Sequence, residues 1–185
     1  RQSLEIHARL VQSRSFNTDQ SGHHPKTTHL RVQVRQGIHD SAYAAQHLSD
    51  YVSVPLKADL SSYDDQDKQM IALLIQASDV MNSLYWQQSW GDKSTLLEKI
   101  GDPQTEHLAE LNYGPWDRLN SDTPFVDGVG PRPPGVQFYP ADMTKEEFEA
   151  SPLKDKISNY TVLRRDANGK LITVPFHEAY KADLE

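Results

Sequence analysis

The sequence predicts a mainly α protein: a helical domain with a long amphipathic central helix, a proline-rich aromatic loop and one β-hairpin near the carboxyl end. Three observations lead to this prediction. Apolar residues follow helical spacing over residues 63–90, six prolines fall within residues 114–140, and Asn168-Gly169 separates two short β-rich segments. These features are typical of a buried helix face, of irregular chain and of a tight hairpin turn, respectively.

The composition is that of a globular protein of about one domain. The 185 residues are 37% hydrophobic and 24% charged, with a net charge of -7. No apolar run reaches the roughly 18 residues that a membrane span requires, and the acidic balance argues against a nucleic-acid-binding domain. The absence of cysteine excludes disulfides, thiolate metal sites and cysteine nucleophiles. It leaves open whether the compartment is cytoplasmic or periplasmic.

The first fifty residues are predicted to contain two helices and a strand. Ser3 can cap a short helix over residues 3–13, in which apolar residues recur at helical spacing. Residues 28–35 alternate apolar and polar side chains, which indicates a strand without an obvious partner. Residues 41–52 are predicted to be helical, with Val52 on the inward face.

The clearest element is the long helix over residues 63–90, which Ser61 or Ser62 can cap and Gly91 ends. Acidic residues at its start suit the helix dipole and lack the glycine and distal glutamate of a calcium loop. Its predicted apolar face consists of Met70, Leu73, Leu74, Ala77, Val80, Met81 and Leu84.

Two shorter helices are expected after it, over residues 94–100 and from a cap at Asp102 onward. The proline-rich loop, residues 114–140, cannot be helix or central strand, and its aromatic residues can anchor it. A capping box at Thr144 then opens a short helix. Residues 160–165 and 170–176 form the predicted hairpin, and residues 176–185 form a last helix.

No complete active site is evident. His177-Glu178 resembles the start of a zinc-protease helix, but position 181 is Lys181 where the second histidine is required. His23, His24 and His29 lack a carboxylate at ligand spacing, so we interpret them as a solvated loop.

Trp86 and Trp90 lie four residues apart near the end of the long helix, with Gln87 and Gln88 between them. One interpretation is that the two rings are core aromatics packed against the proline-rich loop. The other is that they form one wall of a cleft, in which the glutamine amides bind a peptide-like ligand.

Several stretches together resemble bacterial proteins related to dipeptidyl peptidase III, a family of zinc-dependent metallopeptidase-like hydrolases with plant relatives behind a Nudix domain. The most specific are Asn-Tyr-Gly-Pro-Trp-Asp-Arg-Leu and Pro-Gly-Val-Gln-Phe-Tyr-Pro-Ala-Asp-Met-Thr-Lys-Glu-Glu-Phe. The matching stretches are residues 51–60, 85–88, 112–119, 134–148, 160–165 and 174–180.

The resemblance implies that residues 50–185 are the amino-terminal segment of such a domain, preceded by an extension, residues 1–49, of unclear role. The zinc ligands of the family lie downstream of anything in this sequence, so no catalytic or metal residue is assigned here. Zinc is expected in the full-length protein, and the downstream half of that protein is the expected partner. Candidate substrate-binding residues are Asn112, Tyr113, Trp116, Asp117, Phe138 and Tyr139. The alternative, which we favour, is that they brace the loop, because buried aromatic residues with a polar tip commonly anchor loops.

Two hypotheses about function follow. The first is a segment of a zinc-dependent peptidase-like hydrolase that shapes the substrate cleft of the full protein and is inactive alone. The second is a non-catalytic helical binding module. The apolar stripe of Phe176, Ala179, Tyr180 and Leu184 on an uncapped last helix favours an excised piece, with a surface that other material covers.

Overall fold

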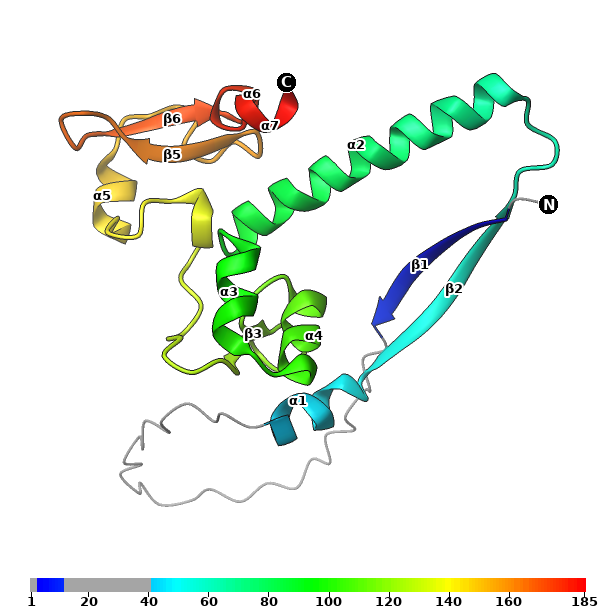
Figure 1. The fold of residues 1–185 in the computed structure, drawn as a ribbon. Coiled ribbons are helices and arrows are strands. Elements are labelled where there is room, and N and C mark those ends of the chain that lie inside the picture. Colours follow the sequence, from blue (N-terminus) through cyan, green and yellow to red (C-terminus); the bar gives the residue numbers. More distant parts are fainter. Residues whose placement is uncertain (1–2, 12–40) are drawn as a thin grey trace, which may run out of the picture.

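The computed structural model describes residues 3–11 and 41–185 (Figure 1). The predicted strand over residues 28–35 lies outside them. Within the described residues, helices occupy more of the chain than strands, and the strands form two-stranded antiparallel ladders. None of the described helices is long and apolar enough to cross a membrane.

The first ladder pairs β1 (Ser3–Val11) with β2 (Tyr51–Asp59) along their whole length, from Ser3 opposite Asp59 to Val11 opposite Tyr51. The prediction of a helix over residues 3–13 is therefore wrong. The same segment also alternates apolar and polar residues over positions 4–10, which suits a strand once a partner is present. That partner lies about fifty residues away in sequence, so the local pattern alone could not choose.

Helix α1 (Ser41–Leu48) is shorter than the predicted helix over residues 41–52, because the chain enters β2 at Tyr51. Val52 is 49% exposed and not inward-facing. Ala44, by contrast, is buried and belongs to the main core.

The long helix is confirmed as α2 (Asp65–Ser89). Its 25 residues correspond to about 37 Å at 1.5 Å per residue. Its cap is Asp64, whose carboxylate accepts hydrogen bonds from the backbone N–H groups of Gln66 and Asp67, and not the predicted Ser61 or Ser62.

Helices α3 (Lys93–Ile100) and α4 (Pro103–Asn112) follow as predicted. Asp92 caps α3, Gly101 ends it in the left-handed conformation, and Asp102 caps α4. The proline-rich loop carries only the short ladder of β3 (Trp116–Asp117) with β4 (Thr123–Pro124) and the 3-10 turn η1 (Val136–Phe138).

The carboxyl-terminal part contains α5 (Lys145–Ala150), capped by Thr144, and the predicted hairpin of β5 (Thr161–Arg165) with β6 (Leu171–Pro175). The predicted last helix is divided into α6 (Phe176–Ala179) and α7 (Lys181–Leu184). The break falls at Tyr180, which leaves helical geometry and is 7% exposed.

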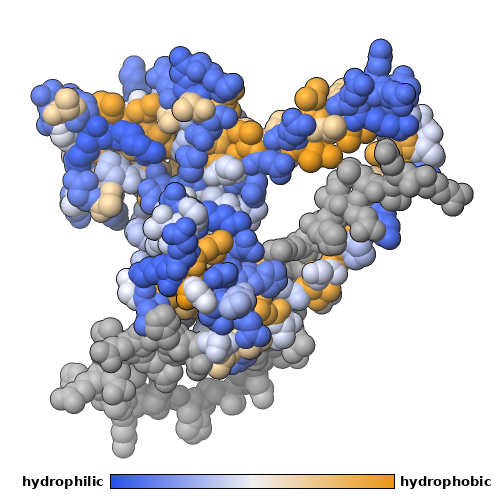
Figure 2. Space-filling view, viewed as in Figure 1, coloured by the Kyte–Doolittle hydropathy of each residue, from blue (hydrophilic) through white to orange (hydrophobic). Residues whose placement is uncertain are grey.

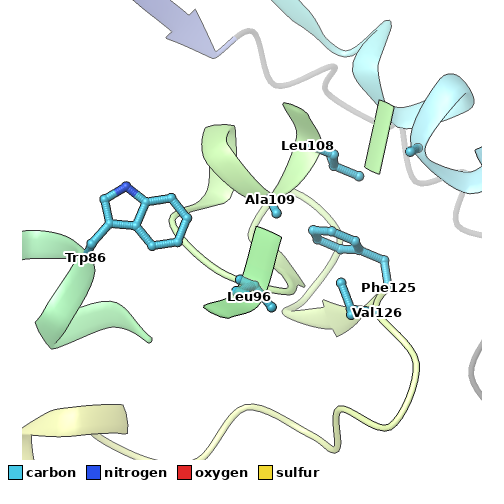
Figure 3. Packing of buried hydrophobic residues seen from close by; sticks show 7 residues of the cluster. Trp86, Leu96, Leu108, Ala109, Phe125 and Val126 are labelled. Atoms are coloured by element: carbon cyan, nitrogen blue, oxygen red, sulfur yellow. The ribbon is translucent and has the colours of Figure 1, made fainter. Parts of the chain in front are cut away.

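Two clusters of buried residues lie against the carboxyl-terminal part of α2. The larger one joins α1, α2, α3, α4 and the proline-rich loop (Figure 3): Ala44, Trp86, Leu96, Leu108, Ala109, Phe125 and Val126. The smaller one joins α2 to the terminal hairpin and helices: Leu84, Val162 and Tyr180. The amino-terminal part of α2 extends away from both clusters (Figure 1).

Candidate functional site

The candidate residues at the end of α4 are placed by a sharp change of chain direction. Tyr113 ends the helix in the left-handed conformation with φ 53°, and Gly114 follows with φ 153°. A side chain at φ near 150° is strained, so glycine suits that position. The turn brings the buried pair Trp116 and Asp117 back beside the helix that precedes them.

Asn112 is buried, and both polar atoms of its side chain are hydrogen-bonded. Its amide nitrogen donates to the Leu108 carbonyl at 2.9 Å. Its amide oxygen accepts from the Tyr51 hydroxyl at 3.2 Å and from the Arg118 backbone N–H at 2.9 Å. One side chain therefore connects α4, β2 and the start of the proline-rich loop.

Asp117 is 1% exposed and contacts α1. One carboxylate oxygen accepts a hydrogen bond from the Tyr43 hydroxyl at 3.0 Å and lies 3.3 Å from Nδ1 of His47. The other oxygen accepts from the Leu119 backbone N–H at 3.0 Å. The same His47 nitrogen lies 3.3 Å from Asp50.

Tyr43 has the most strongly shifted pKa in this network. Burial raises the pKa of Tyr43 to about 12, and the nearby charge of Asp117 acts in the same direction. A hydrogen bond donated by Asn120 to the Tyr43 hydroxyl, at 3.1 Å, opposes the shift. Tyr43 is therefore a neutral hydrogen-bond donor at physiological pH and cannot serve as a proton acceptor there.

Trp116 braces the proline-rich loop. The side chain is 6% exposed, its indole N–H donates to the Gly130 carbonyl at 2.9 Å, and its ring meets Trp90 edge-on at 5.3 Å. Gln137 donates to the Trp90 carbonyl at 2.6 Å. These contacts agree with the first interpretation of the tryptophan pair, in which the rings pack against the loop.

The accessible side of this site is formed by side chains from α2 and the end of α4. The Tyr113 hydroxyl donates to Asn82 at 2.7 Å, and the Tyr113 ring meets Tyr85 edge-on at 4.6 Å. The exposed Arg118 guanidinium donates to the Tyr85 hydroxyl at 2.7 Å and lies over that ring. A cation and two phenol rings are thus held together beside the buried network, to which the Arg118 backbone N–H is hydrogen-bonded through Asn112.

Phe138 and Tyr139 are not part of this group. Phe138 packs on Phe176 of α6, with ring centroids 6.0 Å apart, and Tyr139 packs on Phe148 of α5 at 5.6 Å. The structure therefore unites four of the six candidate residues, Asn112, Tyr113, Trp116 and Asp117, and places the other two against the carboxyl-terminal part. Whether any of the six contacts substrate stays a prediction.

The described residues do not offer a site that fits zinc. No three His, Asp or Glu side chains of that part of the chain converge closely enough to hold a metal ion. His177 is 77% exposed, and its imidazole has Glu178 as its acidic neighbour at 3.9 Å.

The partners that complete the network were not among the residues predicted from the sequence. Tyr43 and His47 are four residues apart on α1, a spacing that places them on one helix face, with their rings 4.2 Å apart. Tyr51 begins one of the stretches that carried the family resemblance. Nothing local to these residues indicated that residues 112–118 would meet them.

The fold and site therefore define a mainly helical scaffold with a buried polar network beside an exposed aromatic-cation surface. It is similar to solved structures of dipeptidyl peptidase III. The structure from Caldithrix abyssi is 35% identical with a TM-score of 0.60, and that from Corallococcus sp. strain EGB is 33% identical with a TM-score of 0.61. Each match covers 69% of this chain and 26% of the solved chain.

A curated relative, Nudix hydrolase 3 of Arabidopsis thaliana, is 20% identical over 76% of this chain and 26% of its own length. No family model matches the chain. The chain thus spans about a quarter of the length of each of these proteins. The expected resemblance to dipeptidyl peptidase III is confirmed at the level of fold, and the chain is similar to a region of a peptidase.

Proposed function

We propose that this chain forms part of the substrate cleft of a zinc-dependent, dipeptidyl-peptidase-like hydrolase that is longer than these 185 residues. The observation that carries the proposal is the combined match in fold and sequence to dipeptidyl peptidase III, at 33% identity or more over 69% of the chain. Because the match covers about a quarter of each solved chain, we assign the activity to the whole protein and a supporting part to this segment.

The site supports a binding role and not a chemical one. The polar side-chain atoms of Asn112 and Asp117 are engaged within the protein, which makes these residues supports. Arg118 and Tyr85, in contrast, keep exposed surface next to that support. A guanidinium held on a phenol ring can donate to a peptide carbonyl or carboxylate at a defined position.

Zinc in this proposal is held by residues outside the described part of the chain. The described residues do not fit the metal, so no step of the reaction is assigned to them. A second candidate function, a non-catalytic binding module, is favoured by the same internal pairing of Asn112 and Asp117. Both functions use the exposed surface at Arg118, and they differ in whether a bound peptide is cleaved.

The test is a kinetic comparison in the whole natural polypeptide, with a chromogenic dipeptide amide as substrate. We expect Arg118→Ala to raise KM about tenfold or more with little change in kcat, because a binding contact is removed. Arg132→Ala is the matched control: this arginine pairs with Asp122 at 3.6 Å, and its replacement should leave both constants unchanged. Equal kinetics for the two variants would contradict the binding role, and absence of cleavage by the unmodified protein would favour the binding module.

A further inference from the structure

The part of α2 between Met70 and Met81 exposes apolar side chains that the rest of the described chain does not cover. Met70 is 55% exposed, Leu73 64%, Leu74 60% and Met81 51%. Figure 2 shows apolar surface along this part of the helix, beyond the body formed by the other elements. A monomeric soluble protein seldom leaves a contiguous stripe of this kind open to water.

The stripe is the continuation of a face that is already buried at its other end. Further along α2, Leu84 is 8% exposed and packs with Val162 and Tyr180. Of the predicted terminal stripe, Phe176, Ala179 and Tyr180 therefore pack on this chain, whereas Leu184 is 50% exposed. The larger uncovered apolar surface lies on α2, one to four turns before Leu84.

More than one side of the helix is apolar here. Residues 70–75 read Met-Ile-Ala-Leu-Leu-Ile, and between Lys68 and the end of the helix Asp79 is the one charged residue. Ile75, 38% exposed, lies about 100° around the helix from Leu74. At 100° per residue, the apolar positions from Val80 round to Ile75 span about 220° of the helix, and Gln76 and Asp79 occupy the remaining side. An apolar face this wide is typical of a helix that packs on more than one neighbour.

The β1–β2 ladder and the segment that leads from it into α2 also expose apolar side chains. Val52 and Leu56 of β2 are 49% and 47% exposed, and Tyr63, just before the helix, is 46% exposed. Strand and helix meet near residues 60–64, at the end of the molecule furthest from the two buried clusters (Figure 1). Apolar side chains are thus exposed on both elements, with the mostly charged residues 64–68 between them.

We propose that residues 70–81 form an interior helix of the longer protein, packed on more than one side by polypeptide outside these 185 residues. This inference rests on the proposed function, since it takes the covering material from the same protein. The solved dipeptidyl peptidase III chains supply the argument for that source: about three quarters of each lies outside the matched region.

Methionine oxidation tests the proposal directly, because sulfoxide formation follows the exposure of the thioether. The whole natural polypeptide is treated with dilute peroxide, native and in urea, and the rate at each methionine is read by mass spectrometry. Met70 and Met81 should react at least about tenfold more slowly in the native protein than in urea. If both side chains were as exposed in the whole protein as they are in this structure, the ratio of the two rates would be below about threefold. A ratio below threefold at both positions would overturn the proposal.

The mass of the same polypeptide separates the possible outcomes. A long polypeptide with unprotected methionines overturns the interior helix and leaves the proposed function standing. A polypeptide of 21.0 kDa whose methionines lose protection on dilution indicates a second copy as the occupant and overturns both proposals. A 21.0 kDa polypeptide with unprotected methionines also overturns both.

A pair of lysine substitutions gives an independent readout in the whole protein. Leu74→Lys should lower Tm by about 5 °C or more, because a charge would be placed in an apolar contact. Ala167→Lys, in the exposed hairpin turn, should change Tm by less than about 2 °C. Equal, small shifts for the two variants would show that residue 74 stays in water in the complete molecule.

Discussion

Trp116 is the residue whose replacement should most weaken the attachment of the proline-rich loop. The side chain is 6% exposed, and burial of a tryptophan removes on the order of 200 Å² from water, which corresponds to about 5 kcal/mol. Its indole N–H bond to the Gly130 carbonyl adds about 1 kcal/mol. Because alanine keeps part of this burial and the loop relaxes partly into the vacated space, we expect Trp116→Ala to lower the free energy of unfolding by about 3–5 kcal/mol.

A graded variant separates the ring from its hydrogen bond. Trp116→Phe keeps most of the apolar contact and leaves the Gly130 carbonyl without its donor, so a loss of about 1–2 kcal/mol is expected. Urea unfolding followed by far-UV circular dichroism measures both variants. Ile157→Ala, at a position that is 77% exposed, is the control and should stay within about 0.5 kcal/mol of the parent. A loss below about 1 kcal/mol for Trp116→Ala would refute the bracing role.

Two further predictions concern the network and the turn before η1. Tyr43→Phe removes the hydrogen bond to buried Asp117 and should cost about 1–3 kcal/mol in urea unfolding. Because the folded-state pKa of Tyr43 is raised to about 12, the stabilisation is present below pH 10 and is lost as the pH rises through about 12. An absorbance titration without a phenol ionising above pH 11 would contradict this. Gly135 has φ 69°, and a Cβ there would overlap the Tyr139 ring, so Gly135→Ala should lose at least about 2 kcal/mol. Gly130→Ala, with open space around its Cβ, should lose no more than about 0.5 kcal/mol, and equal losses would show that the turn accommodates a side chain.

The parts of the fold that could be predicted from sequence are those encoded by adjacent residues. Asn168-Gly169 predicts the β5–β6 hairpin, and Asp102-Pro103 predicts the start of α4, because each signal acts within one turn of the chain. The β1–β2 ladder was missed because its strands lie about fifty residues apart. Residues 3–13 fit both the spacing of a helix and the alternation of a strand, and only pairing with β2 favours the strand.

The candidate site divides in the same way. The stretch over residues 112–117 was identified because its amino-acid sequence is specific, and the structure gathers these residues around one turn. Its partners Tyr43 and His47 come from α1, about seventy residues earlier, and carry no local signal for this contact. Phe138 and Tyr139 share a motif with the candidate list but pack elsewhere, since sequence motifs do not encode which cluster a side chain joins.

The exposed face of α2 has a different origin. Helical spacing correctly predicted which residues share a face, and that pattern was interpreted as burial within this chain. The structure buries the face only near Leu84 and leaves Leu73 and Leu74 in contact with water. Periodicity indicates that a face is to be covered, whereas the identity of the covering material is a long-range property.

The most direct test of the central claim is to identify the product that the natural polypeptide containing this sequence releases from a short unlabelled peptide. The polypeptide is purified through a tag from the cells that make it, and the products are identified by mass. The account predicts release of a dipeptide, abolished by a metal chelator and restored by zinc. Release of no product by a protein with bound peptide, or of single amino acids alone, would contradict the claim that these residues belong to a dipeptidyl-peptidase-like hydrolase.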